Sequence, residues 1–266
     1  MRRSRRSSSG SCGASPPTGA GGGCGSRPSA RSCPVPPPSR PCPAPSPAPE
    51  GRSPVLSGHA GEILGGFTTT LLLTACAFPL ALVLGCVVAI CRISPVRPLR
   101  AAGRLYVDLV RNSPLLLIAV LLIFGLPDAG VLIPLFWCLV LALGVYFGAY
   151  VCETVRSGIR AVDRGQVEAA RAIGLPFRRV VLDVLLPQAF RAMVQPLGTI
   201  LINVALGSAL GAAVGVDELT LETRSFNLET AEPILAFAVA ACGYLVINLA
   251  VSGVVRLVER KVRVLR

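Results

Sequence analysis

The residues that most often carry catalysis are scarce in this 266-residue chain. Lys261 is the only lysine and His59 is the only histidine. A nucleotide-binding P-loop needs a lysine followed by Ser or Thr after its glycine turn, but Lys261 is followed by Val262. A Ser-His-Asp relay would have to use His59, which lies beside a Pro- and Gly-rich segment. We therefore expect no catalytic residues in this chain.

Cysteine is the remaining residue type that could support chemistry. The chain has ten cysteines, and no two of them form a CxxC pair. Zinc sites usually draw their ligands from such pairs, so a metal site is not expected. Cys76, Cys138 and Cys152 are examples that lie in apolar runs, where cysteine acts as a small hydrophobic residue. We expect neither a bound metal nor a cofactor.

The composition indicates that the chain is embedded in a membrane. Hydrophobic residues make up 52% of it and charged residues only 15%, and its mean hydropathy is +0.64. A soluble domain usually carries about 25% charged residues. The net charge is +12, but the basic residues lie in the N-terminal segment and at the ends of apolar runs. A nucleic-acid-binding domain would present them on a folded polar surface, so we expect no nucleic acid partner.

The chain divides into two parts of different composition. Residues 1–58 are rich in Arg, Ser, Pro and Gly, with eight arginines and Glu50 as their one acidic residue. Such a segment buries too little apolar surface to offset the entropy of ordering. We interpret it as a disordered, low-complexity N-terminal extension, or as the result of a start codon placed too far upstream, and expect it to be dispensable. Residues 59–266 form the predicted transmembrane domain.

Five apolar runs predict an all-α membrane protein with about five transmembrane helices. They are Ile63–Cys91, Leu115–Leu126, Val131–Cys152, Leu197–Val216 and Ile234–Val255. A helix of about 20 residues spans the hydrocarbon core of a bilayer, and only the second run is too short. We expect that run to be extended backward through Leu109 and Val110. Before it, Arg104 and Asp108 stand four residues apart, as in a short helix along the membrane surface.

Small and polar residues within these runs indicate where helices meet. Five glycines stand four residues apart in two runs, and we expect them to permit close helix packing: Gly144, Gly148, Gly207, Gly211 and Gly215. Gly243 in the fifth run lies outside such a repeat, so we expect Gly211→Leu to disrupt packing far more than Gly243→Leu. Asn203 and Ser208 are polar groups in an apolar span and are predicted to border a translocation path. The alternative is that Ser208 bonds only its own backbone.

The distribution of basic residues predicts the orientation. The linkers Arg92–Arg111 and Arg156–Arg191 and the C-terminus are basic, whereas Asp217–Glu232 holds five acidic residues against Arg224 alone. Basic loops stay in the cytoplasm, so we expect a multi-pass protein of the cell membrane with its N-terminus outside and its C-terminus cytoplasmic. The arginines of residues 1–58 do not follow this rule. The acidic linker is expected to be a solvated loop or, alternatively, a contact for a binding protein.

The longest basic linker contains the signals of a helix, a corner and a second helix. Asp163 and Gln166 have the spacing of a capping box, which begins a helix. Gly174 suits a left-handed helix end, and Pro176 suits the first turn of a second helix that would end at Pro187. This arrangement predicts a compact projection from the membrane domain. It could receive a partner or only pack against its own bundle, and these features alone do not decide between the two.

The same linker carries a pattern that resembles a known family. The matching residues are Glu168, Ala169, Ala170, Gly174, Val184, Leu186 and Pro187. Their spacing resembles the EAA loop of ABC-importer permeases, with Val184 where Ile is usual. In that family the loop is a coupling helix that docks into a groove of the ATP-binding subunit. The resemblance implies this coupling role for Glu168, Ala169, Ala170 and Gly174.

Other segments resemble the polar amino acid branch of these permeases, and glutamate-type permeases most closely. They are Arg111–Leu116, Ala149–Ile159 and Gly215–Leu219. The family often has Lys, Asp or Asn followed by Thr or Ser in the fourth span, where this chain has Leu206, Gly207 and Ser208.

The resemblance implies a permease subunit that translocates an amino acid, with glutamate as one candidate. It further implies ATP-binding cassette ATPase subunits, a second permease subunit and an extracytoplasmic solute-binding protein as partners, besides the lipid bilayer. The alternatives are a permease for another small polar solute, a secondary transporter and a membrane-embedded enzyme. The spans hold almost no ionisable groups, which disfavours the last two.

Overall fold

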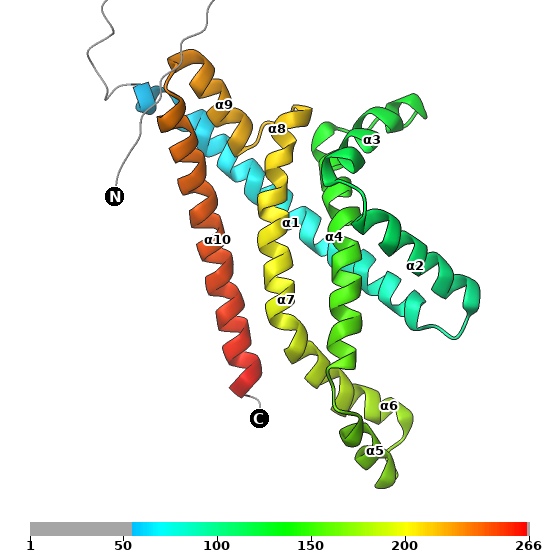
Figure 1. Ribbon diagram of the computed structural model, residues 1–266. Helices are drawn as coiled ribbons and strands as arrows, with labels where there is room; N and C mark the ends of the chain where they lie inside the picture. The colour runs from blue at the N-terminus through cyan, green and yellow to red at the C-terminus, as the bar shows by residue number, and fades with distance from the viewer. Residues whose placement is uncertain (1–54, 265–266) are drawn as a thin grey trace, which may run out of the picture. The chain divides into compact units, whose positions relative to one another are not determined.

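The computed structural model describes residues 55–264 of the chain. Every regular element in that range is helical (Figure 1), which confirms the predicted all-α membrane fold. The predicted N-terminal extension lies almost entirely outside the described residues, so its dispensability stays a prediction. The first helix begins at Val55, shortly before the predicted start of the membrane domain.

Four helices in the described part of the chain are long and apolar enough to cross a membrane. They are α1 (Val55–Ile93), α4 (Leu135–Arg160), the continuous segment Phe177–Val214 that contains α7 (Leu186–Gly207), and α10 (Pro233–Val264). A fifth span is possible if α2 (Arg97–Arg111) and α3 (Leu115–Asp128), which meet at an angle of 104°, form one broken span. The remaining elements are α5 (Arg164–Ala172), α6 (Phe177–Arg179), η1 (Val180–Leu185), η2 (Ser208–Leu210), α8 (Gly211–Val214) and α9 (Leu219–Thr230).

The second apolar run does not extend backward as one continuous helix, contrary to the prediction. Leu109 and Val110 belong to α2, which ends at Arg111, and α3 begins after a sharp bend. Asn112 and Ser113 donate their side-chain hydrogen bonds to the carbonyl oxygens of Asp108 and Leu109, at 2.7 and 2.8 Å. These bonds satisfy carbonyl groups that a continuing helix would use, and Pro114 disfavours a helical conformation at the residue before it. The helix therefore breaks between α2 and α3.

The structure also corrects both ends of the fourth span. No helix ends at Pro187, because α6, the π-helical η1 and α7 form one continuous helical segment. Pro187 lies in the first turn of α7 and lacks an amide hydrogen, and a π-helical turn is one way to accommodate a missing ladder bond. Pro176 is the N-cap of α6, one residue before the predicted first turn. At the other end, Gly215 lies outside α8 and ends it with φ +87°.

The core of the described region lies where α1 crosses α4. A Cβ atom on Gly85 of α1 would lie 2.7 Å from the carbonyl oxygen of Gly148, and one on Gly144 would lie 2.5 Å from Leu80 Cδ2. Leu73, Leu139 and Leu143 are fully buried around this crossing. The two backbones thus approach closely through small residues, as membrane helices do when van der Waals packing holds them together. Gly85 was not among the glycines predicted to permit close helix packing.

The acidic segment after the fourth span is also different from the predicted solvated loop. Most of it folds into α9, which packs against α1 and α10. Glu218 is fully buried at the start of this helix and accepts hydrogen bonds from the amides of Thr220 and Leu221 at 2.9 and 3.1 Å. Tyr244 of α10 donates its hydroxyl to the same carboxylate at 2.7 Å. The buried carboxylate is stable there because its oxygens are bonded on several sides.

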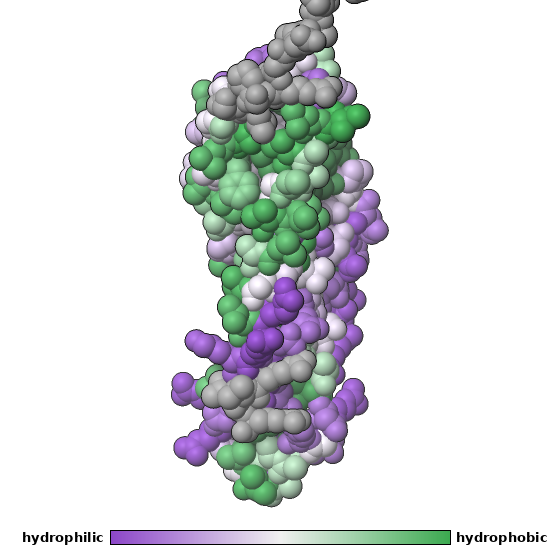
Figure 2. All heavy atoms as spheres, turned by 90° about the vertical axis from the view of Figure 1, so that its left-hand side faces the viewer, coloured by the Kyte–Doolittle hydropathy of each residue, from purple (hydrophilic) through white to green (hydrophobic). Residues whose placement is uncertain are grey.

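The polarity of the surface changes along the length of the bundle. Figure 2 shows apolar residues over much of the upper part of the visible face and hydrophilic residues gathered lower down. In Figure 1 the lower end carries α5, α6 and the C-terminal end of α10, whereas α9 lies at the opposite end. An apolar belt bounded by polar ends is the surface expected of a protein in a bilayer.

Candidate functional site

The predicted helix–corner–helix projection is present, and local contacts build it. Asp163 is the N-cap of α5, and its Oδ1 atom accepts a hydrogen bond from the amide of Gly165 at 2.8 Å. Gly174 ends the helix with φ +82°, a left-handed conformation that glycine adopts without the usual Cβ penalty. The amides of Gly174 and Leu175 bond the carbonyl oxygens of Arg171 and Ala170 at 3.0 and 3.2 Å. We call residues 163–185 the α5 arm.

The predicted capping box is only half formed. Asp163 caps the helix, but the side-chain oxygen of Gln166 accepts a hydrogen bond from Gln188 at the start of α7. Gln166 therefore ties the arm to the membrane bundle instead of closing the cap. Because the sequence separation of the two glutamines is 22 residues, local capping patterns could not reveal this contact.

The three residues of the Glu-Ala-Ala motif differ in exposure. Glu168 and Ala169 are exposed, whereas Ala170 is 6% exposed and packs toward the remainder of the arm. Gly174 is also exposed, and a Cβ atom added there would meet no atom within 4 Å. The motif thus offers one alanine to the protein's interior and the other, together with Glu168, to an outside partner.

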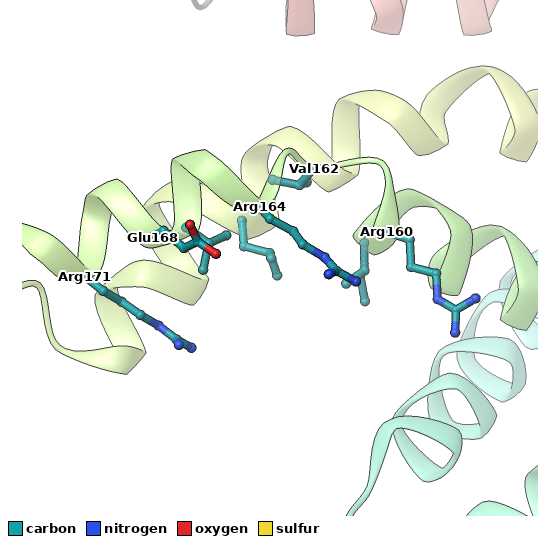
Figure 3. Close-up of a pocket in the computed structure, with 8 residues that line it drawn as sticks. Arg160, Val162, Arg164, Glu168 and Arg171 are labelled. Carbon is teal, nitrogen blue, oxygen red and sulfur yellow. The ribbon is translucent and has the colours of Figure 1, made fainter.

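A groove of about 560 Å³ runs beside α5. Figure 3 shows Arg160 from the end of α4 and Arg164, Glu168 and Arg171 from α5 along it. Val162 and Leu185 supply apolar surface to the same groove. Three cations around one carboxylate, with apolar surface between them, can receive a complementary acidic or mixed surface of another protein.

A second cavity, of about 550 Å³, lies between α4 and α7. Its polar lining includes Arg111, Tyr150, Glu153, Ser157 and Asn203. The Arg111 guanidinium carbon lies 5.2 Å from the centroid of the Tyr150 ring, within the range of a cation–π contact. The cavity therefore presents both signs of charge to a bound solute, and its volume is that of a small-molecule site.

The two polar residues predicted for the translocation path have different environments. Asn203 is exposed and lines the second cavity. Ser208 is fully buried, and its hydroxyl donates to the carbonyl oxygen of Ala205 at 2.7 Å. The backbone bond at Ser208 is the alternative considered from the sequence, and the structure does not bring Ser208 to the cavity beside Asn203.

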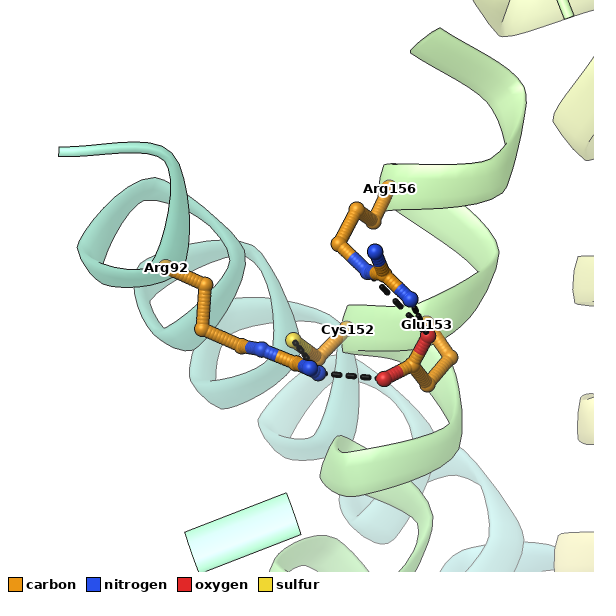
Figure 4. Close-up of polar contacts among 4 residues, drawn as sticks. All are labelled: Arg92, Cys152, Glu153 and Arg156. Carbon is orange, nitrogen blue, oxygen red and sulfur yellow. Dashed lines mark hydrogen bonds and ion pairs between the residues drawn. The ribbon is translucent and has the colours of Figure 1, made fainter. Parts of the chain in front are cut away.

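An ion cluster joins the end of α1 to α4 next to this cavity. Arg92 and Arg156 both bind the Glu153 carboxylate, and the Arg156–Glu153 distance is 2.7 Å. Arg92 also lies 3.9 Å from the sulfur of Cys152 (Figure 4). With two guanidinium groups on one carboxylate, the cluster has a net positive charge.

The glycines of the fourth span lie at helix contacts, but so does Gly243 of the fifth span. A Cβ atom on Gly207 would lie 3.2 Å from Phe147, and one on Gly211 would lie 2.9 Å from Leu139 Cδ2. On α10, a Cβ atom on Gly243 would lie 2.6 Å from Leu219 Cδ2. Gly243 is therefore packed at least as closely as Gly211, which does not support the predicted difference between them, because its neighbour lies on α9, a segment predicted to be a linker.

The part of the chain with described side chains holds no group of three or more His, Cys, Asp or Glu residues that could bind a metal ion. The features described above are the groove beside α5, the cavity between α4 and α7 and the exposed helix α5. A family model for the inner membrane component of binding-protein-dependent transport systems matches residues 81–264. The chain belongs to this family. The match spans the α1–α4 crossing, the α5 arm and both concavities.

Curated relatives of this permease come from amino acid importers. The chain is 36% identical over 208 residues to the probable glutamine ABC transporter permease protein GlnM of Bacillus subtilis, covering 78% of this chain and 96% of GlnM. It is 34% identical to the arginine transport system permease protein ArtQ of the same organism, covering 76% and 92%. It is 32% identical to the glutamate/aspartate import permease protein GltJ of Escherichia coli, covering 77% and 89%. The resemblance to the polar amino acid branch is confirmed.

A solved structure shows the same fold. The structure described as "Crystal structure of an amino acid ABC transporter with histidines" matches with a TM-score of 0.73 at 30% identity, covering 77% of this chain and 96% of that chain. A structure of the MetNI methionine ABC transporter matches with a TM-score of 0.61 at 20% identity, covering 80% and 99%. At that lower identity the similarity concerns the fold alone.

Proposed function

We propose that this permease imports a polar amino acid and that separate ATPase subunits drive it by docking on the α5 arm. The main structural support for this proposal is the arrangement of α5. This helix exposes Glu168 and Ala169 beside a groove lined by Arg160, Arg164 and Arg171. Such an exposed and charged concavity can bind another subunit. The family match disfavours the alternative of a secondary transporter, because members of this family depend on a binding protein.

The docking step can be tested with a bulky residue on the exposed face of α5. The partner sought in the experiment is a P-loop ATPase, first among the products of the genes beside this one. Ala169→Trp should abolish its co-purification, because the indole would occupy the contact surface. Ala101→Trp on the exposed side of α2 is the matched control and should leave co-purification intact. Equal recovery of the ATPase with both variants would contradict the docking site, whereas no recovery with the unaltered chain would contradict the proposed partner.

The cavity between α4 and α7 is the proposed path for the solute. Arg111 lines this cavity and can bind a carboxylate group of an amino acid. Because Arg92 and Arg156 already neutralise Glu153, the surroundings favour a solute with an additional negative charge. Glutamate is therefore our specific candidate, and another small polar solute is the alternative.

Uptake into vesicles with competing amino acids would separate these substrates. Labelled glutamate uptake should be competed more strongly by unlabelled glutamate than by glutamine or arginine. Arg111→Gln should reduce uptake without lowering the amount of protein in the membrane.

A cysteine at position 203 in a cysteine-free background should react with a water-soluble thiol reagent in one nucleotide state and not in the other. Equal inertness in both states, in an active protein, would remove Asn203 from the path.

The distribution of charge supports a topology in which the α5 arm is cytoplasmic. Arg178 and Arg179 are exposed on the arm, whereas Glu229 and Glu232 are exposed near α9 at the other end. By the positive-inside tendency the arm faces the ATPase and the α9 end faces an extracytoplasmic solute-binding protein. A second permease subunit, identical or homologous, would complete the path. Cysteines placed at Arg178 and Leu228 should be labelled from opposite sides of the membrane, and labelling from one side would contradict this topology.

A further inference from the structure

A cavity of about 470 Å³ lies between the end of α1, α2 and the end of α4, and arginines dominate its lining. The lining residues are Arg92, Arg100, Arg104, Arg156 and Arg160, together with Ile93 and Ile159. We call this cavity the arginine pocket. It is separate from the cavity between α4 and α7, although Glu153 and its two arginines lie between them.

The arginine pocket carries more positive charge than its acidic neighbours neutralise. The Glu153 carboxylate forms ion pairs with both Arg92 and Arg156. Among the described residues, no ion pair is formed by Arg100, Arg104 or Arg160. Asp108 stands four residues from Arg104 but does not form an ion pair with it. Convergent like charges in a partly enclosed site raise the free energy unless an anion is bound.

Arg100 shows where such an anion would bind. Its Nε atom is buried and has no hydrogen-bond partner, and its terminal nitrogen reaches only the carbonyl oxygen of Pro95 at 3.4 Å. A buried guanidinium donor without an acceptor costs free energy, and the shape of that group suits two oxygens of a phosphate. The geometry at Arg100 therefore lacks an oxygen acceptor that a ligand can supply.

Exposed apolar residues beside the arginine pocket indicate what kind of ligand supplies the oxygen acceptor, because they suit the acyl chains of a lipid. Ile90 and Ile93 at the end of α1 are 68% and 55% exposed, and Leu105 and Leu109 on α2 are each 60% exposed. On α2 the leucines and the arginines occupy different faces, so the helix has an apolar exposed side and a cationic side. A helix of this kind lies at the membrane surface, with its apolar side toward acyl chains and its arginines at headgroup level.

We propose that the arginine pocket binds the phosphate headgroup of an anionic phospholipid, whose acyl chains lie along the exposed apolar residues of α1 and α2. Basic pockets between membrane helices bind such headgroups through the same electrostatic attraction that draws anionic lipids to basic residues at the membrane surface. The lipid would hold α2 against α1 and α4 next to the break between α2 and α3. The pocket shares Arg160 and Ile159 with the groove beside α5, whereas Arg100 and Arg104 line the pocket alone.

Native mass spectrometry of the full chain in detergent would test this proposal. The probes are dioleoylphosphatidylglycerol and dioleoylphosphatidylcholine, which carry the same acyl chains and differ in headgroup charge. The unaltered chain should retain phosphatidylglycerol on the order of tenfold better than phosphatidylcholine, with a preference that weakens in high salt. An Arg100→Gln/Arg104→Gln variant should lose that preference.

An Arg97→Gln/Arg178→Gln variant is the matched control, because it removes the same charge from exposed positions outside the pocket. It should retain the lipid preference, and circular dichroism should show equal helix content in all three proteins. Equal preference in both variants, or none in the unaltered chain, would overturn the proposal. Displacement of the lipid by excess inorganic phosphate would also overturn it, since the site would then bind free phosphate. Loss of ATPase binding without loss of lipid preference would identify the pocket as a protein contact instead.

Discussion

The α5 arm and the α1–α4 crossing are built in opposite ways. In the arm, Asp163 and Gly174 determine where the helix begins and ends, and each acts on residues a few positions away. At the crossing, Gly85 meets Gly148, which is more than 60 residues away in the chain. The arm leaves Glu168 and Ala169 exposed, whereas the crossing leaves no room for an added methyl group. A surface for a partner and a rigid scaffold thus have different tolerances to substitution.

The largest expected effect is at the crossing. In Gly85→Leu the new Cβ atom would lie 2.7 Å from the backbone oxygen of Gly148, which cannot move aside as a side chain can. We expect a loss of stability of about 3 kcal/mol or more. Thermal unfolding in detergent can be followed by the fluorescence of Trp137, the only tryptophan in the chain. Gly125→Leu on α3, where an added Cβ meets nothing within 4 Å, should unfold like the unaltered protein. Similar melting of both variants would show that the crossing is not the rigid region.

Glu218 tests whether the opposite end of the bundle belongs to the scaffold. Glu218→Ala would leave the Thr220 and Leu221 amides and the Tyr244 hydroxyl without their acceptor. We expect a loss of about 2 kcal/mol in the free energy of unfolding. Glu168→Ala in the arm is the matched control, since Glu168 is exposed. Its melting temperature should not change, and a drop equal to that of Glu218→Ala would remove the distinction between the two regions.

Gly174 in the α5 arm provides the opposite test, because a substitution there should reduce coupling to ATP hydrolysis more than it reduces the stability of the fold. In Gly174→Val, a β-branched residue would have to adopt φ +82° at a local cost of about 1–2 kcal/mol. We expect normal amounts of protein in the membrane but reduced transport and ATPase stimulation. Gly165 lies in α5 and is not in the left-handed region, so Gly165→Val controls for the added β-branched side chain without the strain at φ. Unchanged uptake by Gly174→Val would contradict a coupling role for this turn.

The smallest effect is expected at Glu222 on α9. Partial burial raises the pKa of its carboxyl group above the ordinary value of 4.5, and the nearby carboxylates Asp217, Glu62 and Glu218 raise it further. A raised pKa means that the folded protein holds this proton more tightly, so ionisation destabilises the fold as the pH rises past the folded pKa. Glu222→Gln should therefore melt at a slightly higher temperature at neutral pH, and this gain should vanish below pH 4.5. A gain that is constant across the pH range would contradict this explanation.

The sequence by itself determined the helical membrane fold and the arm, because both depend on short-range patterns. Long apolar runs predict spans, and the spacing from Asp163 to Gly174 predicts a capped helix with a left-handed end. The same short range explains where the prediction was wrong. A continuous helix through Pro187 depends on the π-helical turn before it, and the break before Pro114 depends on two side chains that bond the preceding carbonyls.

Tertiary structure alone decided which polar and small residues meet. Glu218 reads as part of an acidic loop until Tyr244 of α10 is brought to its carboxylate. Gly243 has no repeat around it, yet it lies against Leu219 because α9 folds between α1 and α10. Asn203 and Ser208 are both polar residues of the fourth span, but Asn203 lines the cavity whereas Ser208 is buried among neighbouring helices. Packing between distant helices determines these environments, and no local pattern encodes it.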